Sequence, residues 1–339
     1  MLKGCSGPLL EGYDLAMFDL DGVIYVGRHA IPGVAERLQR VRDNGGHLAF
    51  VTNNASRTPE NVANRLVKLG IHATPADVVT SAQAAARVVT QRFGPDAAVV
   101  LLGGAGLEAA LAAEGVRITT EAGEASAVVS GYGPDVLWKD VMRAATLVRG
   151  GLPYIASNTD LTIPTDEGLA PGHGVLVAAI AGFAGVEPIV AGKPARPLMD
   201  ETIRRVGGER PLMVGDRLDT DIEGAHAVGV DSLLVMTGVT HLAELVTATP
   251  ELRPSYIAPD LEGLFEAHGV PDHQESQTRL GGWVATVHGQ ALEMAGTGSS
   301  ADWWRVVAAA SWAALDRSGS PVDVTNLQPP AASTLASEA

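Results

Sequence analysis

Two carboxylates, Asp19 and Asp21, directly follow the apolar run 15–18 and precede a glycine. Asp and Gly are common in turns after strands, so a simple turn explains the pair equally well. In a functional interpretation, Asp19 attacks phosphorus to form an aspartyl-phosphate, while Asp21 protonates the leaving oxygen and then activates a water molecule. Close carboxylates raise each other's pKa, which suits one of them to hold this proton.

A second acidic segment, residues 215–221, also follows an apolar run and carries Asp216, Asp219 and Asp221. An ordinary helix start would also explain it, with Asp219 or its neighbour Thr220 as the cap. Asp216, however, is of the ligand type that Mg²⁺ prefers, because this hard cation binds a few protein oxygens and keeps several waters. The predicted metal ligands are Asp19, Asp21 through its backbone carbonyl, and Asp216. We expect Asp219 and Asp221 to be nearby ligands or to support the ligands from behind.

Three polar residues, Thr52, Asn53 and Asn54, follow the apolar run 48–51. A polar turn is the simplest explanation of these residues when they are considered alone. A hydroxyl together with successive backbone N–H groups can, however, cradle a phosphate. We therefore predict that this segment contacts the phosphate of a substrate.

Lys193 lies between a glycine and Pro194. The proline disfavours helical geometry at the lysine and tends to open the next helix, so the ammonium group would lie at a helix entrance. Most lysines lie on the surface without such a role. All four polar segments follow apolar runs, and ligands bind at the carboxyl edge of an open parallel sheet. Together the segments supply a nucleophile, an acid, a metal site and cations for a phosphoryl group.

Apolar runs alternate with helical patterns through much of the chain. Strands are predicted over 15–18 and 48–51, and a helix is predicted after Thr58, a candidate N-cap that precedes a proline. The same alternation resumes from residue 189 to residue 258. It predicts an α/β fold with a Rossmann-like parallel sheet and right-handed crossovers.

The chain is predicted to contain three parts. Residues 1–80 and 186–270 form a discontinuous core, and residues 81–185 form an inserted α/β domain with its own strands and helices. Residues 271–339 form a small extension, in which four of the five tryptophans lie after position 280.

The extension has a pattern of its own. Residues 283–287 and 291–295 predict a β-hairpin, and residues 301–317 predict a helix. From Ser318 onward, the content of Pro, Ser and Ala predicts a loose, disordered tail.

The four polar segments resemble the motifs of a known family, the phosphatases of the haloacid dehalogenase superfamily. The matching segments are Asp19-x-Asp21-Gly22-Val23, Thr52-Asn53-Asn54, Gly192-Lys193-Pro194 and Gly215-Asp216-Arg217-x-Asp219-Thr220-Asp221. The resemblance runs from about Leu10 to Phe265. It is strongest to the branch with a large cap between the second and third motifs, which includes p-nitrophenyl-phosphate, phosphoglycolate, pyridoxal-phosphate and glycerol-phosphate phosphatases.

This resemblance implies a role for single residues. Asp19 would be the nucleophile, Asp21 the acid and base, and Asp216 a Mg²⁺ ligand. Thr52 and Lys193 would contact phosphate. Residues 81–185 would be the cap that selects the substrate.

The cap carries a resemblance of its own. Residues 156–174 are similar to the substrate-facing loop of the family, and Asn158 and Asp160 are candidates to bond a polar leaving group. His173 is a further candidate, although the other eight histidines are scattered without ligand spacing. Residues 271–339 look like a fragment of an acetyltransferase-type fold. They lack the Gly-rich loop that binds acetyl-CoA, which favours a structural or interaction role.

Composition excludes several classes of protein. The net charge of −15 leaves no excess of Lys and Arg to neutralise nucleic acid, and no apolar run reaches the roughly 18 residues that would cross a membrane. Cys5 is the only cysteine, which excludes a disulfide framework. The N-terminus lacks the pattern of a secretory signal. We therefore expect a cytoplasmic protein.

The expected function is hydrolysis of a small phosphorylated metabolite by a Mg²⁺-dependent phosphomonoesterase. The preferred substrate is glycerol 3-phosphate, on the resemblance of the cap and the extension, and 2-phosphoglycolate or another small phosphoester is the alternative. A phosphotransferase or mutase would use the same intermediate, and a receiver-type signalling module is disfavoured by the cap. A homodimer is possible, because caps in the resembling branch often mediate dimers.

Overall fold

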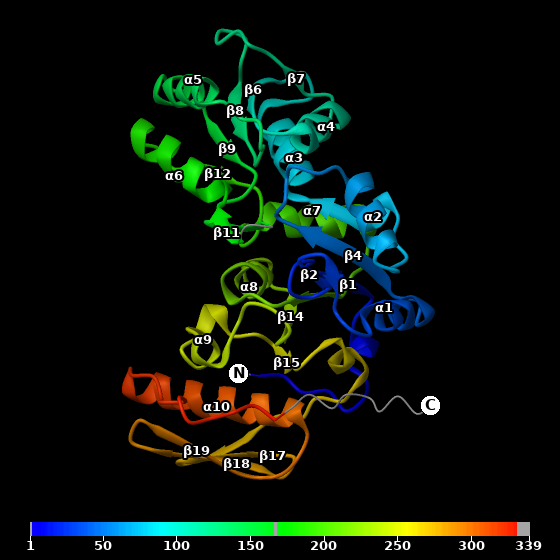
Figure 1. Ribbon diagram of the computed structural model, residues 1–339, viewed down its shortest axis with the longest axis vertical. Coiled ribbons are helices and arrows are strands. Elements are labelled where there is room, and N and C mark those ends of the chain that lie inside the picture. Colours follow the sequence, from blue (N-terminus) through cyan, green and yellow to red (C-terminus); the bar gives the residue numbers. More distant parts are fainter. Residues whose placement is uncertain (1, 166–167, 331–339) are drawn as a thin grey trace. The chain divides into compact units, whose positions relative to one another are not determined.

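The computed structural model describes residues 2–165 and 168–330, and its elements are shown in Figure 1. The chain forms two compact units. Unit 1 comprises Met1–Val26, Ala30–His47 and Glu209–Ala339, and unit 2 comprises Gly27–His29 and Leu48–Gly208. Each unit contains parallel strands and helices, which confirms the predicted α/β fold. The division into core, cap and extension stays a prediction.

Unit 1 is built around parallel strands in the order β15-β14-β13-β1. Their bounds are Leu15–Phe18 for β1, Pro211–Gly215 for β13, Asp231–Val235 for β14 and Tyr256–Ala258 for β15. Every residue of β1 is buried, as expected for a parallel strand that is covered on both faces. Phe18 is paired with Val214, so the chain leaves β1 and β13 at the same edge.

Short elements surround this sheet. Near the N-terminus they are η1 (Leu9–Gly12), β2 (Tyr25–Val26), β3 (His29–Ala30) and α1 (Val34–Asp43). After β13 they are the π-helix η3 (Leu218–Ile222), α8 (Glu223–Val228), α9 (Leu242–Val246), η4 (Pro250–Leu252) and η5 (Leu261–Phe265). None of the helices within residues 2–165 and 168–330 is long and apolar enough to cross a membrane.

The extension is an antiparallel sheet packed against one long helix, and both belong to unit 1. The strands are β16 (Asp272–Gln274), β17 (Gln277–Leu280), β18 (Trp283–His288) and β19 (Ala291–Gly296), and the helix is α10 (Ser300–Ser318). The predicted hairpin corresponds to β18 and β19, and the predicted helix to α10. The sequence analysis missed β16 and β17, because both are short and mostly polar.

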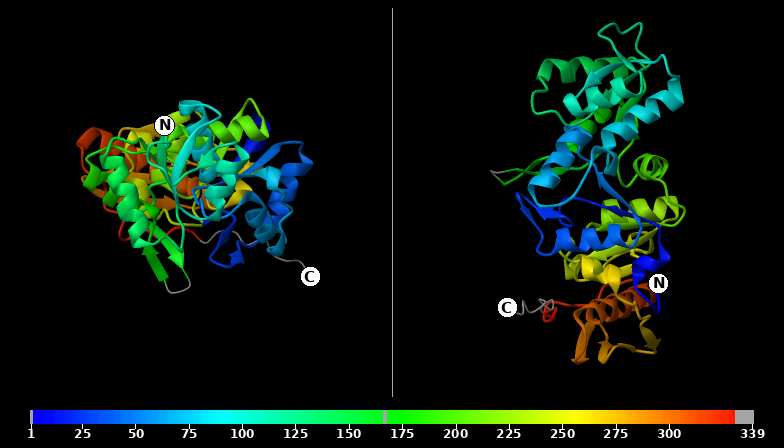
Figure 2. Two further views of the ribbon diagram at one scale, coloured as in Figure 1. Left: turned by 90° about the horizontal axis from the view of Figure 1, so that it is seen from above. Right: turned by 90° about the vertical axis from the view of Figure 1, so that its right-hand side faces the viewer.

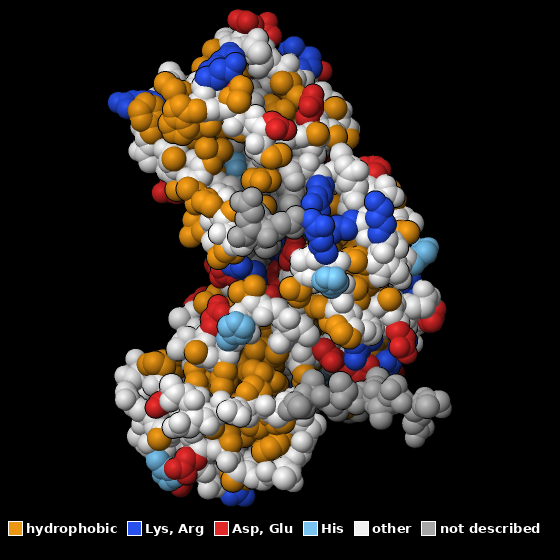
Figure 3. Space-filling view, viewed as in Figure 1, with side chains coloured by type: hydrophobic (Ala, Val, Ile, Leu, Met, Phe, Trp, Pro, Cys, Tyr) orange, Lys and Arg blue, Asp and Glu red, His pale blue; other side chains and the backbone are white. Residues whose placement is uncertain are grey.

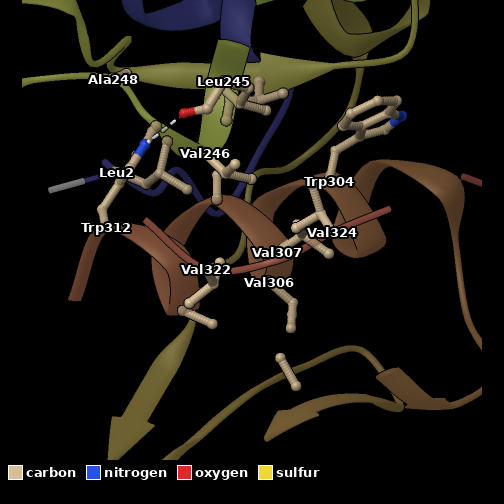
Figure 4. Packing of buried hydrophobic residues seen from close by; sticks show 14 of the residues in the cluster. Leu2, Leu245, Val246, Ala248, Trp304, Val306, Val307, Trp312, Val322 and Val324 are labelled. Atoms are coloured by element: carbon tan, nitrogen blue, oxygen red, sulfur yellow. Dashed lines mark hydrogen bonds between the residues drawn. The ribbon is translucent and has the colours of Figure 1, made fainter. Parts of the chain in front are cut away.

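The helix α10 joins the extension to the parallel sheet of unit 1 through one hydrophobic cluster (Figure 4). The indole N–H of Trp312 donates to the carbonyl of Leu245 at 2.8 Å. Val322 and Val324 are also buried in this cluster, so the prediction of a loose tail from Ser318 is wrong for this stretch. Residues 331–339 of the predicted tail lie outside the described residues.

Unit 2 contains a parallel sheet in the order β12-β9-β8-β6-β7. The strands are β6 (Ala98–Leu102), β7 (Arg117–Ile118), β8 (Ala127–Ser130), β9 (Tyr154–Ala156) and β12 (Ile189–Val190). The helices around them are α3 (Ser81–Phe93), α4 (Ala105–Ala113), α5 (Trp138–Arg149), α6 (His173–Ala184) and α7 (Arg196–Val206).

Unit 2 contains further paired strands. β4 (His47–Thr52) is paired in parallel with β5 (Val78–Thr80), and α2 (Pro59–Lys68) and η2 (Pro75–Asp77) connect them. The hydroxyl of Thr58 caps α2, as predicted. A hairpin of β10 (Thr162–Thr165) and β11 (Gly168–Pro171) occupies the segment that was predicted as a loop, and it projects from unit 2 in both views of Figure 2.

Candidate active site

Three carboxylates meet at the edge where β1 and β13 end. Asp19, Asp216 and Asp221 each offer an oxygen, and these oxygens lie within 4.8 Å of one another. Asp19 is the first residue after β1, and its backbone N–H donates to the carbonyl of Val214 at 2.9 Å. The pairing of parallel strands thus places Asp19 and Asp216 side by side, as predicted for two of the metal ligands.

Backbone N–H groups hold the two fully buried carboxylates of this cluster in place. Asp221 accepts the N–H groups of Asp216 and Arg217, both at 3.1 Å. Asp216 accepts the N–H of Val239 at 2.7 Å through Oδ2. The π-helix η3 brings Asp221 back toward the end of β13, so the residue lies inside the cluster and not only behind it.

Two glycines allow this packing around Asp216. A Cβ atom at Gly22 would lie 2.3 Å from Oδ2 of Asp216, and one at Gly238 would lie 1.9 Å from the same oxygen. Gly22 also has a φ of +87°, a backbone conformation that side chains disfavour. The glycine after Asp21 is therefore required by the site as well as by the turn.

The remaining acidic candidates lie outside the cluster of three. Asp219 is half-exposed and accepts two hydrogen bonds from the guanidinium of Arg217, at 2.8 and 3.0 Å. Asp21 is exposed, and its neighbour Gly22 donates to the carbonyl of Tyr25 at 2.8 Å. Asp21 is predicted to contribute a backbone carbonyl to the metal, and this contribution stays a prediction.

The cluster has the chemistry of a site for a hard divalent cation. Its donors are carboxylate oxygens that lie within 4.8 Å of one another, and oxygen ligands of this kind are the ones that hard divalent cations prefer. Asp19 and Asp216 are two of the predicted ligands, and Asp221 would be a third or would orient Asp216.

The phosphate-binding candidates belong to unit 2. Thr52 ends β4, and its hydroxyl oxygen accepts the N–H of Asn54 at 3.1 Å. Asn54 accepts both the N–H and the hydroxyl of Ser56, at 2.9 and 2.7 Å. This loop therefore has the bonds of an ordinary polar turn, and its contact with phosphate stays a prediction.

The second polar group of unit 2 is centred on Asn53. Its side chain bonds the main chain of Lys193 and the carboxylate of Asp160, and its backbone carbonyl accepts the amide of Asn158 at 2.6 Å. Asn53, Asn158 and Lys193 are all buried. The structure thus brings together four candidates that are separated by 140 positions in the sequence. The sequence analysis did not anticipate that they bind one another.

His173 opens α6 and lies in the core of unit 2. Its Nε2 is 3.0 Å from the hydroxyl of Ser130, which is in turn 2.9 Å from the hydroxyl of Tyr154. Burial lowers the pKa of His173 to about 4 and raises the pKa of Tyr154 to about 12. Both groups are therefore neutral near pH 7, which is typical of a hydrogen-bonded core histidine. A contact between His173 and the leaving group stays a prediction.

Known families match both ends of the region that carries these motifs. Residues 16–117 match the model described as haloacid dehalogenase-like hydrolase, and residues 190–264 match a second hydrolase model of the same superfamily. The chain is 40% identical over 299 residues to the D-glycerol 3-phosphate phosphatase of Mycobacterium tuberculosis. This match covers 87% of this chain and 82% of the relative. It is also 34% identical over 254 residues to an acid sugar phosphatase of Staphylococcus epidermidis. That match covers 74% of this chain and 96% of the relative.

A solved structure is similar over nearly the whole chain. The crystal structure of the glycerol phosphate phosphatase from M. tuberculosis in complex with magnesium matches with a TM-score of 0.83 and 39% identity. The match covers 91% of this chain and 92% of that one. The fold, the motifs and these relatives agree, and the chain belongs to the haloacid dehalogenase-like hydrolases.

Proposed function

We propose that this protein hydrolyses small phosphomonoesters in a Mg²⁺-dependent reaction, with glycerol 3-phosphate as the substrate. The observation that carries the proposal is the cluster of Asp19, Asp216 and Asp221 at one edge of the sheet. When bound there, Mg²⁺ supplies positive charge that stabilises the transferring phosphoryl group.

The chain's own residues carry the proton and phosphoryl steps of the proposed reaction. An oxygen of Asp19 attacks phosphorus, and the bond from phosphorus to the leaving oxygen breaks as Asp21 gives that oxygen a proton. Asp21 then takes a proton from water, whose oxygen attacks the same phosphorus. This second step frees Asp19 and inorganic phosphate. Thr52 and Lys193 bind the phosphate oxygens in this proposal.

The choice of glycerol 3-phosphate rests on how much of the chain matches. By sequence, the acid sugar phosphatase covers 74% of this chain, whereas the M. tuberculosis D-glycerol 3-phosphate phosphatase covers 87%. Residues 271–339 are about 20% of the 339 residues, so the larger match includes part of the extension. The extension packs on the parallel sheet of unit 1 through α10, and this supports a structural role for it.

We also propose a homodimer that forms through α5 and α6. Trp138 and Met142 on α5 and Val175 and Phe183 on α6 are all about half exposed or more, and none of the 12 residues of α6 is Asp, Glu, Lys or Arg. Hydrophobic side chains gather over these helices in Figure 3. The guanidinium of Arg149 on α5 lies over the ring of Phe183, 4.9 Å from its centroid, so the face is mainly apolar, and such faces are typical of a contact between copies. Sedimentation should show a dimer that Phe183→Glu converts to a monomer, and a monomeric wild type would contradict this proposal.

A cytoplasmic location belongs to the same proposal, supported by the single free cysteine Cys5.

The reaction is tested by phosphate release from a panel of small phosphomonoesters, with and without Mg²⁺. The panel contains both enantiomers of glycerol 3-phosphate, 2-phosphoglycolate and a sugar phosphate. Release is expected to be fastest from a glycerol phosphate and to require Mg²⁺. Release without Mg²⁺ would contradict the metal assignment. If release required an added acceptor alcohol, the protein would be a phosphotransferase.

A further inference from the structure

Asn53 uses its whole side-chain amide on other parts of unit 2. Its Oδ1 accepts the backbone N–H of Lys193 at 2.8 Å, and its Nδ2 donates to the backbone carbonyl of Lys193 at 3.0 Å. The second N–H of Nδ2 donates to Asp160 at 2.9 Å. An asparagine amide has only two N–H donors, so neither is left for a substrate.

The bonds to Lys193 fix which amide atom is oxygen. A backbone N–H only donates and a backbone carbonyl only accepts, so the amide has one orientation that satisfies both. The Asn53 amide therefore bonds both the N–H and the carbonyl of Lys193, as a residue on a paired β-strand would. Because the Lys193 side chain begins at the Cα atom between these two bonded groups, the position of its ammonium group depends on Asn53.

The surroundings of Asn53 are built for this contact. A Cβ atom at Gly192 would lie 2.6 Å from Oδ1 of Asn53, so the residue before Lys193 has to be glycine. The backbone carbonyl of Asn53 accepts the hydroxyl of Ser81 and the amide of Asn158, both at 2.6 Å. The oxygen of the Asn158 side chain accepts the N–H of Asp160 at 3.2 Å.

We infer that Asn53 is a positioning residue that ties Lys193 to the Asp160 loop, residues 157–161 of the predicted cap, and that its side chain does not bind phosphate. This inference rests on the proposed function, in which Lys193 binds the phosphate group. It gives Asp160 a second role, since the carboxylate holds the amide that holds Lys193. A displacement of the Asp160 loop would therefore move Lys193 and change the binding of the phosphate group, even though the loop itself is expected to contact the leaving group.

Inorganic phosphate is the probe that separates this role from simple leaving-group recognition, because it has no leaving group. Asp160→Ala removes the hydrogen bond that the Asn53 amide donates to this carboxylate, and the loss of such a bond to a charged group is expected to change the affinity about tenfold. We expect this variant to raise the inhibition constant of inorganic phosphate about tenfold. Asp160→Asn keeps an oxygen that accepts from Asn53, so it should restore most of the inhibition. Asn64→Ala, on the exposed face of α2, is the matched control and should change nothing.

A double-mutant cycle with Asn53→Ala tests the connection itself. Asn53→Ala should raise the inhibition constant of inorganic phosphate more than tenfold, since it removes three hydrogen bonds. Adding Asp160→Ala to it should have little further effect, because the connection is already broken. Circular dichroism shows whether the Asn53 variant folds. If it does not fold, the comparison of the two Asp160 variants decides the question alone.

Two results would overturn the inference. One is an inhibition constant for phosphate that Asp160→Ala leaves within twofold of the wild type. The other is a cycle in which the effects of the two substitutions multiply. Both are measured against an active wild type, and a wild type that releases phosphate from no phosphomonoester would overturn the proposed function instead.

Discussion

The substitution Gly238→Ala should displace Asp216, a proposed metal ligand, without removing any charged group. A Cβ atom at this position would lie 1.9 Å from Oδ2 and 2.5 Å from Cγ of Asp216, whereas ordinary contacts begin at 3.4 Å. The carboxylate would have to move by about 1.5 Å, and it is fully buried. It cannot make this movement and keep its bond from the N–H of Val239.

The size of the effect follows from these two losses. A hydrogen bond to a charged group contributes about 1.5–3 kcal/mol, and an extra methyl group in a packed interior costs about 1–3 kcal/mol. We expect a loss of about 2–5 kcal/mol in the free energy of unfolding. A misplacement of about 1 Å can cost about a hundredfold in rate, and disturbed ligand geometry costs about 10–100-fold in metal affinity.

The assay is a Mg²⁺ titration of phosphate release, with a thermal melt in parallel. For Gly238→Ala, the Mg²⁺ concentration that gives half of the maximal rate should rise at least tenfold. Gly12→Ala is the control, since a Cβ atom there meets nothing within 4 Å. If Gly238→Ala kept the wild-type Mg²⁺ requirement, Asp216 would not be a metal ligand and our account of this cluster would be refuted.

Two further predictions concern stability. Trp312→Ala removes a buried indole and its hydrogen bond to Leu245, so it should lower the free energy of unfolding by about 3–5 kcal/mol. The KM should stay unchanged. A melting temperature within about 2 °C of the wild type would contradict this prediction. Burial and the nearby positive charge of Arg305 lower the pKa of His268 from 6.5 to about 4, so the unfolded chain binds this proton more readily. The resulting stability is present above about pH 6.5 and is lost as the pH falls toward 4. In His268→Gln, Tm should therefore decrease less between about pH 6.5 and pH 4 than in the wild type. An equal decrease of Tm in both proteins would contradict this role of His268.

The strands and motifs of the sheet could be predicted from the sequence because their signals are local. The run 15–18 has the bounds of β1, the run 48–51 lies within β4, and Asp19 and Asp216 follow their strands as expected. Once two parallel strands are assigned, geometry places the residues at their ends on one edge. The Asp19–Asp216 part of the cluster therefore required no knowledge of the tertiary structure.

The contacts that depend on side-chain packing could not be predicted in this way. Asp221 was expected as a nearby ligand or as support for the ligands, but no local pattern showed that a π-helix returns its carboxylate to the end of β13. Asn53 was expected at phosphate because it lies in a loop whose hydroxyl and backbone N–H groups could cradle an anion. Its actual partners lie 107 and 140 positions away, and no local pattern announces them. The burial of Val322 and Val324 was not predicted, because the composition of the segment around them is typical of a disordered tail.

The central claim is that Asp19 carries the phosphoryl group during turnover. Acid quenching of the enzyme while it turns over glycerol 3-phosphate with Mg²⁺, followed by mass spectrometry, tests it directly. We expect one added phosphoryl group on the peptide that contains Asp19, and neither label nor turnover in Asp19→Asn. Steady turnover by Asp19→Asn, or a label on another residue, would contradict the account.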